Sequence, residues 1–235
     1  MENINRIRGL SIWIFFLPLV ALNLCLFISV NFLLFENTIF IVDEIGRSGF
    51  TIPYIDGSVS ISRTARTYPA YLIFKPAMII TAILLIKYWL ANNKLIGIIN
   101  NETEKNKKFL IFGIASAVFL IVHSIFLGIK FDHDLYKLFR RFVILGFIIF
   151  EIVAQTLLVI SIFKVKEKIE KNIVKNVLFL KIILVSVLII VAIVSIPFLI
   201  SSGHVHFKHA LEWNYFVGVI LFYLLSFLFW KKVQA

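Results

Sequence analysis

The sequence predicts an all-α polytopic membrane protein with six transmembrane helices, and three observations support this prediction. The chain of 235 residues is 60% hydrophobic with a mean hydropathy of +0.97, well above an ordinary soluble domain. Its apolar residues form runs of the roughly 20 residues that a helix needs to cross the bilayer. Six such runs use nearly the whole chain, so we expect a single transmembrane domain over 1–235.

Each apolar run is long enough to span the bilayer with some tilt. The runs cover residues 11–35, 70–90, 109–129, 142–163, 177–200 and 211–230. The first follows a basic start, but no small-residue cleavage site comes after it, so we expect a retained helix rather than a signal peptide. Lys75, Lys87 and Lys181 lie near the ends of their runs, where a long side chain is expected to reach the headgroups.

The distribution of basic residues predicts the orientation of the helices. Lysine and arginine are more numerous in the two terminal segments and the second and fourth connections than in the other three connections. Cytoplasmic segments carry such an excess, so we expect both termini in the cytoplasm and a long first loop on the outer or lumenal side. The net charge of +11 lies in these short basic runs, so we expect no nucleic-acid partner.

The first outer loop contains candidate lipid-binding residues. Asp56 and Gly57 predict a tight turn, and Arg63 and Arg66 are three residues apart, a spacing at which two guanidinium groups could clamp one phosphate. The alternative is a polar loop whose arginines meet headgroups without specificity. The residues that we assign to a phosphate-bearing or glycosylated lipid are Tyr54, Asp56, Arg63, Arg66 and His123.

Glu151 is the one acid in the middle of an apolar run, and Gln155 follows it by one helical turn. Such a carboxylate is costly unless it is paired or faces a cavity. We expect His123, Asn23 or Asn31 as its partners. A structural hydrogen-bond network and a functional site are both open alternatives.

All five histidines lie in the outer half of the predicted topology, three of them just before or at the start of the last run. His209 and Glu212 are our candidate catalytic residues, together with Glu151, with no cofactor expected. Imidazole and carboxylate also bind zinc, so an alternative is a metal-dependent lipid hydrolase. The residues of that alternative metal site are His204, His206, His209, Asp132 and His133.

Several short motifs resemble the FRAG/DRAM/SFK membrane family, which includes a Golgi protein of GPI-anchor lipid remodelling and the damage-regulated autophagy modulators. The motifs are Pro53-Tyr54-Ile55-Asp56-Gly57, Tyr68-Pro69-Ala70 with Phe74, His209-Ala210-Leu211-Glu212-Trp213, and Glu151 on the fourth run. Here Ala70 replaces a glutamate of the family, and the family's loop serine is absent. The resemblance implies six spans and a role in lipid processing at the lumenal leaflet.

These observations together predict a membrane protein that binds an anionic or glycosylated lipid at its outer leaflet and takes part in remodelling the acyl chains. We expect it in an endomembrane, such as the Golgi, ER or lysosome, or in the plasma membrane. Two further functions stay open: the metal-dependent hydrolase and a non-enzymatic membrane scaffold or regulator. Whether the protein is an enzyme is not decided by the sequence.

Overall fold

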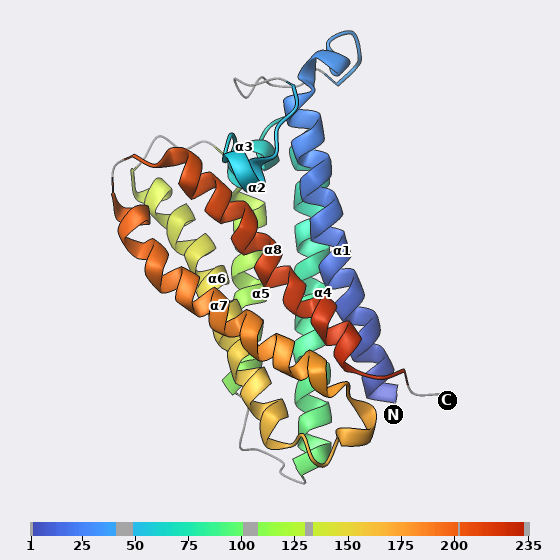
Figure 1. Cartoon of the computed structure of the whole chain (residues 1–235). Coiled ribbons are helices and arrows are strands. Elements are labelled where there is room, and N and C mark those ends of the chain that lie inside the picture. The colour runs from blue at the N-terminus through green and yellow to red at the C-terminus, as the bar shows by residue number, and fades with distance from the viewer. Residues whose placement is uncertain (1, 41–48, 101–107, 130–133, 202, 233–235) are drawn as a thin grey trace.

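The computed structural model describes residues 2–40, 49–100, 108–129, 134–201 and 203–232 (Figure 1). In these residues the chain is helical without strands, and six helices are long and apolar enough to cross a membrane. This confirms the all-α polytopic fold. The six are α1 (Glu2–Val30), α4 (Ala70–Asn100), α5 (Lys108–Phe126), α6 (Asp134–Lys164), α7 (Lys175–Ile200) and α8 (Val205–Phe229).

Several helices extend beyond the apolar runs that predict them. Helix α1 begins at Glu2 instead of residue 11, and α4 continues to Asn100 instead of ending near residue 90. Helix α6 begins at Asp134 instead of residue 142. Hydropathy marks only the part of a helix that lies in hydrocarbon, whereas backbone hydrogen bonding continues into the polar interface.

The helices form a bundle in which α7 is the most peripheral (Figure 1). Helix α1 packs against α4 and α8, while α5 packs against α4 and α6. Helix α7 contacts α8 and α6 and is the least buried of the six. The two termini lie at the same end of the bundle, which we call the inner end (Figure 1). The opposite end, with the first loop and the start of α8, is the outer end.

Aromatic side chains fill the bundle core. Trp89 and Phe109 are buried, with ring centroids 6.3 Å apart. Tyr88 and Tyr223 meet edge to face with centroids 5.0 Å apart. A Cβ on Gly113 would collide with the Trp89 ring, so glycine at this position lets α5 approach α4 closely.

Two short helices, α2 (Pro53–Asp56) and α3 (Ile61–Ala65), lie at the outer end beside the start of α8 (Figure 1). At the inner end, the connection between α6 and α7 is tied to the residues after α8. The Val174 N–H donates to the Phe229 carbonyl at 2.9 Å, and the Lys231 N–H donates to the Asn172 carbonyl at 2.9 Å. Each end of the bundle is thus fixed by contacts between distant segments of the chain.

Candidate functional site

The predicted turn in the first outer loop is present and is built around Asp56. Its carboxylate accepts the Ser58 N–H at 2.8 Å and the Ile52 N–H at 3.2 Å. Burial alone would raise the pKa of Asp56, but the hydrogen bonds from Ser58, Ile52 and Thr51 outweigh it and lower the pKa to about 2. The carboxylate therefore organises its own turn, as aspartate does in many loops.

The start of α8 holds this turn through the carbonyl oxygen of Gly57. The Nδ1 atoms of His206 and His209 lie 3.2 and 3.0 Å from that oxygen. A carbonyl oxygen only accepts hydrogen bonds, so each imidazole donates from Nδ1. Gly57 itself has a φ of +57°, and a Cβ there would collide with the His206 carbonyl. Glycine is needed for both the turn and the close approach.

The next turn of α8 continues the same interface. Trp213 is buried and donates its indole N–H to the Val59 carbonyl at 2.8 Å. Asn214 donates to the Tyr54 carbonyl at 2.6 Å, while the Tyr54 hydroxyl donates to Asn23 on α1 at 3.1 Å. The Tyr54 ring also packs edge to face on Trp213, with centroids 5.0 Å apart. Tyr54 therefore joins the loop to two transmembrane helices.

Glu212 caps α3. Its carboxylate accepts backbone hydrogen bonds from Ile61 and Ser62, the first two residues of that helix, whose N-cap is Ser60. A carboxyl group at a helix N-terminus satisfies free N–H groups there. His209 and Glu212 thus come together at the outer end, and both contact the backbone of the first loop.

Glu151, the third candidate catalytic residue, lies deeper in the bundle. The Tyr223 hydroxyl donates to its carboxylate, and Tyr223 is eleven residues beyond Glu212 on α8. At 1.5 Å of rise per residue, these positions are about 16 Å apart along the helix. The structure therefore does not bring Glu151 together with His209 and Glu212.

The expected partners of Glu151 were wrong. Its Oε2 atom lies 2.6 Å from the Ser116 hydroxyl, and its Oε1 accepts from Gln155 at 3.0 Å and from Tyr223. Asn23 and Asn31 instead donate to carbonyls of α1, and His123 is not among the three side chains bonded to Glu151. The sequence does show Gln155 one turn away, but it cannot show which hydroxyls of α5 and α8 face this carboxylate.

Lys181 is a second buried ionisable group, and the expectation that it reaches the headgroups was wrong. Its side chain is fully buried, with Nζ 2.8 Å from the Ser226 hydroxyl and 4.0 Å from the Phe222 ring centroid. The Tyr88 hydroxyl lies 3.0 Å from the same Ser226 oxygen. The position of Lys181 near the end of an apolar run gave no sign that α8 covers it.

A cluster of basic side chains lies at the outer end, near the end of α3 and the start of the spanning part of α6. We call Arg63, Arg66 and Arg140 the arginine cluster. Burial, followed by the charges of Arg140 and Arg63, lowers the pKa of Arg66. Arg140 also interacts electrostatically with His123. The sequence analysis assigned Arg63, Arg66 and His123 to the lipid, but it missed Arg140, whose proximity to Arg66 depends on how α6 packs in the bundle.

Among the side chains that the structure describes, no carboxylate forms an ion pair with the arginine cluster. The one ion pair among these described side chains joins Glu170 and Lys175, at the inner end. The Nε atom of Arg140 is buried and has no hydrogen-bond partner. Repulsion of the Arg66 charge by Arg63 and Arg140 favours an anion beside Arg66.

The structure describes three of the five residues of the alternative metal site. In the described residues, no group of three or more His, Cys, Asp or Glu side chains is arranged to hold a metal ion. His206 and His209 share a carbonyl oxygen, while His204 is the N-cap of α8 and contacts the ring of Phe198. Asp132 and His133 lie outside the described residues.

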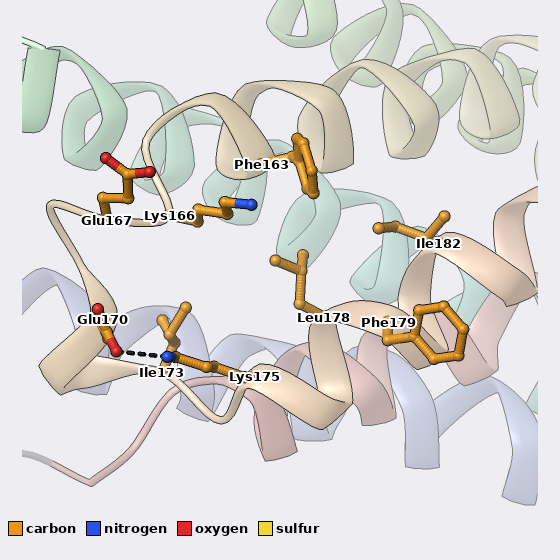
Figure 2. Close-up of a pocket in the computed structure, with 9 residues that line it drawn as sticks. All are labelled: Phe163, Lys166, Glu167, Glu170, Ile173, Lys175, Leu178, Phe179 and Ile182. Atoms are coloured by element: carbon orange, nitrogen blue, oxygen red, sulfur yellow. Dashed lines mark ion pairs between the residues drawn. The ribbon is translucent and has the colours of Figure 1, made fainter.

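A cavity of about 400 Å³ lies at the inner end between the end of α6 and the start of α7 (Figure 2). The sequence analysis gave no signal for it, because its walls come from two helices and their connection. Its lining is Phe163, Lys166, Glu167, Glu170, Ile173, Lys175, Leu178, Phe179 and Ile182.

No family model, no curated protein and no solved structure matches the chain.

Proposed function

We propose that the protein binds the phosphate-bearing headgroup of a membrane lipid at its outer end and takes part in remodelling that lipid. The observation that carries this proposal is the arginine cluster. The charges of Arg63 and Arg140 both act on Arg66, and among the side chains that the structure describes no carboxylate forms an ion pair with any of the three. Arginine is well suited to binding phosphate oxygens in pairs.

The position of the cluster supports a lipid over a soluble anion. Arg66 precedes the membrane-spanning part of α4, and Arg140 lies near the start of the spanning part of α6. Both therefore lie at the level where lipid headgroups meet the acyl chains. Lys75 donates to the Ile125 carbonyl at 3.3 Å nearby, which adds positive charge at the same level.

The contacts between the first outer loop and α8 fix the position of this site. Contacts from His206, His209, Glu212 and Trp213 to the segment 57–62 position α3, and Arg63 belongs to α3. His209 and Glu212 thus support the site as positioning residues. The remodelling step itself rests on the resemblance to the FRAG/DRAM/SFK family and is part of the proposal.

Lipid retention tests the headgroup site. Purified protein is placed in phosphatidylcholine nanodiscs with or without phosphatidylinositol, and bound lipid is measured by native mass spectrometry. The double variant Arg66→Gln/Arg140→Gln is expected to retain phosphatidylinositol about tenfold less well, because two charge-assisted contacts are lost. Arg6→Gln/Lys94→Gln removes the same charge at the inner end and should match the wild type.

Equal phosphatidylinositol retention by the cluster variant and the wild type contradicts the headgroup site. Acyl remodelling is tested separately, by comparing the acyl chains of phosphate-bearing lipids in cells that express the wild type or the cluster variant. If the wild type retains phosphatidylinositol but the acyl chains are the same in both kinds of cell, the function is restricted to binding.

A further inference from the structure

The cavity at the inner end has one apolar wall and one polar rim (Figure 2). Phe163 from α6 and Leu178, Phe179 and Ile182 from α7 form the apolar wall. The charged residues come from the connection between the helices and from Lys175, the first residue of α7. Helices α6 and α7 diverge here because the loop between them is held against the end of α8. The cavity is therefore an opening between two helices that the connection keeps apart.

One cation at the rim is not paired. Glu170 and Lys175 form an ion pair with each other, marked by the dashed line in Figure 2. Lys166 instead places its Nζ 4.2 Å from the ring centroid of Phe163, and no carboxylate of the described residues pairs with it. Figure 2 shows the Lys166 ammonium directed along the cavity toward Phe163. A positive charge without a carboxylate partner in the described residues thus lies directly beside apolar surface.

The cavity lies at the membrane–water boundary. The spanning part of α6 ends at Lys164, and that of α7 begins at Lys175. Phe163 and Phe179 are both part of the lining and exposed on the outside of the bundle, so the apolar wall continues into the faces of α6 and α7 that contact acyl chains. Lipid from this leaflet has direct access to the cavity.

The net positive charge of the connection beside the cavity favours anionic lipids. Between residues 164 and 175 the sequence has five lysines, at 164, 166, 168, 171 and 175, against the two glutamates Glu167 and Glu170. Basic residues next to a membrane attract anionic lipids.

We propose that this cavity binds one anionic phospholipid of the leaflet at the inner end, with its phosphate at Lys166 and an acyl chain along Phe163, Leu178 and Ile182. The site lies at the opposite end of the bundle from the arginine cluster and does not depend on it. An apolar wall explains why a phospholipid, and not a soluble phosphate, is the ligand: the chain contributes contact area that a free anion lacks.

Substitution at the rim tests the headgroup contact. The probe is phosphatidylglycerol in phosphatidylcholine nanodiscs, with retention measured by native mass spectrometry. Lys166→Gln is expected to weaken phosphatidylglycerol retention roughly fivefold, as the loss of one cation–phosphate contact would. Lys171→Gln removes the same charge from the same connection but does not line the cavity, and it should behave as the wild type. An excess of inorganic phosphate should not displace the lipid.

Filling the apolar wall tests the acyl contact independently. Ile182→Trp places an indole in the cavity, whereas Ile183→Trp places one on the exposed face of α7. The first should reduce retained phosphatidylglycerol severalfold, and the second should not. Circular dichroism and gel filtration show whether each variant is folded.

Three results overturn the proposal. One is equal loss of retention in Lys166→Gln and Lys171→Gln, which would mean a general attraction to the basic connection. Another is wild-type retention in folded Lys166→Gln and Ile182→Trp proteins. Displacement by inorganic phosphate alone would assign the site to a soluble anion and would also overturn it.

Discussion

The Nδ1 atom of His209 lies 3.0 Å from the carbonyl oxygen of Gly57, a residue 152 positions earlier in the chain. With His206 on the same oxygen, this contact makes α8 the main support of the first outer loop. The loop joins α1 to α4, yet α2 packs against α8. Changes in this interface are therefore expected to affect the outer end as a unit.

Gly57→Ala should destabilise the outer end. The residue has a φ of +57°, and the new Cβ would collide with the His206 carbonyl, so backbone strain and overlap add to a cost of about 2 kcal/mol or more. Thermal unfolding in detergent measures this effect. Gly49→Ala is the control, because Gly49 also has a positive φ, +98°, but no atom within 4 Å of the added Cβ. Equal destabilisation by both changes would show that backbone strain alone is responsible.

Trp213→Phe should also loosen the loop. It removes the donor to the Val59 carbonyl, which is 2.8 Å away and buried with the indole. An unsatisfied buried carbonyl costs about 1–3 kcal/mol. Trp13→Phe is the matched control, since Trp13 is largely exposed on α1. Faster proteolysis within the first loop in Trp213→Phe alone is the expected result, and equal proteolysis rates in the two variants would contradict it.

Acid should release the turn at Asp56. The folded-state pKa is about 2, below the unfolded value of about 3.9. The charged carboxylate therefore stabilises the turn fully above about pH 4, and this contribution is lost as the pH falls toward 2. Fluorescence of Trp213, which packs on Tyr54, reports the change. Asp56→Asn should lose this acid response, and an unchanged response in that variant would assign the titration to another group.

Lys181 and Ser226 are expected to respond to substitution in opposite ways. The Ser226 hydroxyl donates to the Phe222 carbonyl and accepts from Lys181 and Tyr88, so its hydrogen-bonding capacity is filled. Ser226→Ala removes the hydrogen-bond partner of the buried Lys181 amine and of the buried Tyr88 hydroxyl. It should lower the free energy of unfolding by about 2–4 kcal/mol. Lys181→Met removes a costly buried group at similar volume and should leave stability equal to or above that of the wild type.

The double variant Lys181→Met/Ser226→Ala should be more stable than Ser226→Ala alone, because the stranded amine is gone. Chemical denaturation in detergent measures all three proteins. Lys87→Met serves as a control, since Lys87 lies exposed on α4. A double variant less stable than Ser226→Ala would show that Lys181 makes a net favourable contribution.

The sequence predicted the fold well because hydrocarbon imposes a strong length and composition requirement on each helix. It also predicted the tight turn at Asp56 and Gly57, because turn chemistry is local. Prediction was poorer for the ends of helices. Helix α4 continues past Leu90 and α6 begins before Phe142, in both cases through polar residues.

Contacts between helices were the least predictable. Glu151 was recognised as a buried acid, but the hydroxyls of Ser116 and Tyr223 that bond to it come from other helices. Arg140 and the inner cavity were missed for the same reason: rotation and tilt of a helix decide which side chains converge. Apolar sequences specify these angles only weakly, since every face is compatible with lipid.

The long separation between the first outer loop and α8 has a consequence for the order of folding. The hydrogen bonds from His206, His209, Trp213 and Asn214 to this loop all join residues at least 149 positions apart. Contacts so distant in sequence carry a large loop-closure cost and form late. Helices α1 and α4 can pair as soon as both are inserted, but the segment between them must wait for α8. The outer end is therefore the last part of the molecule to acquire its shape.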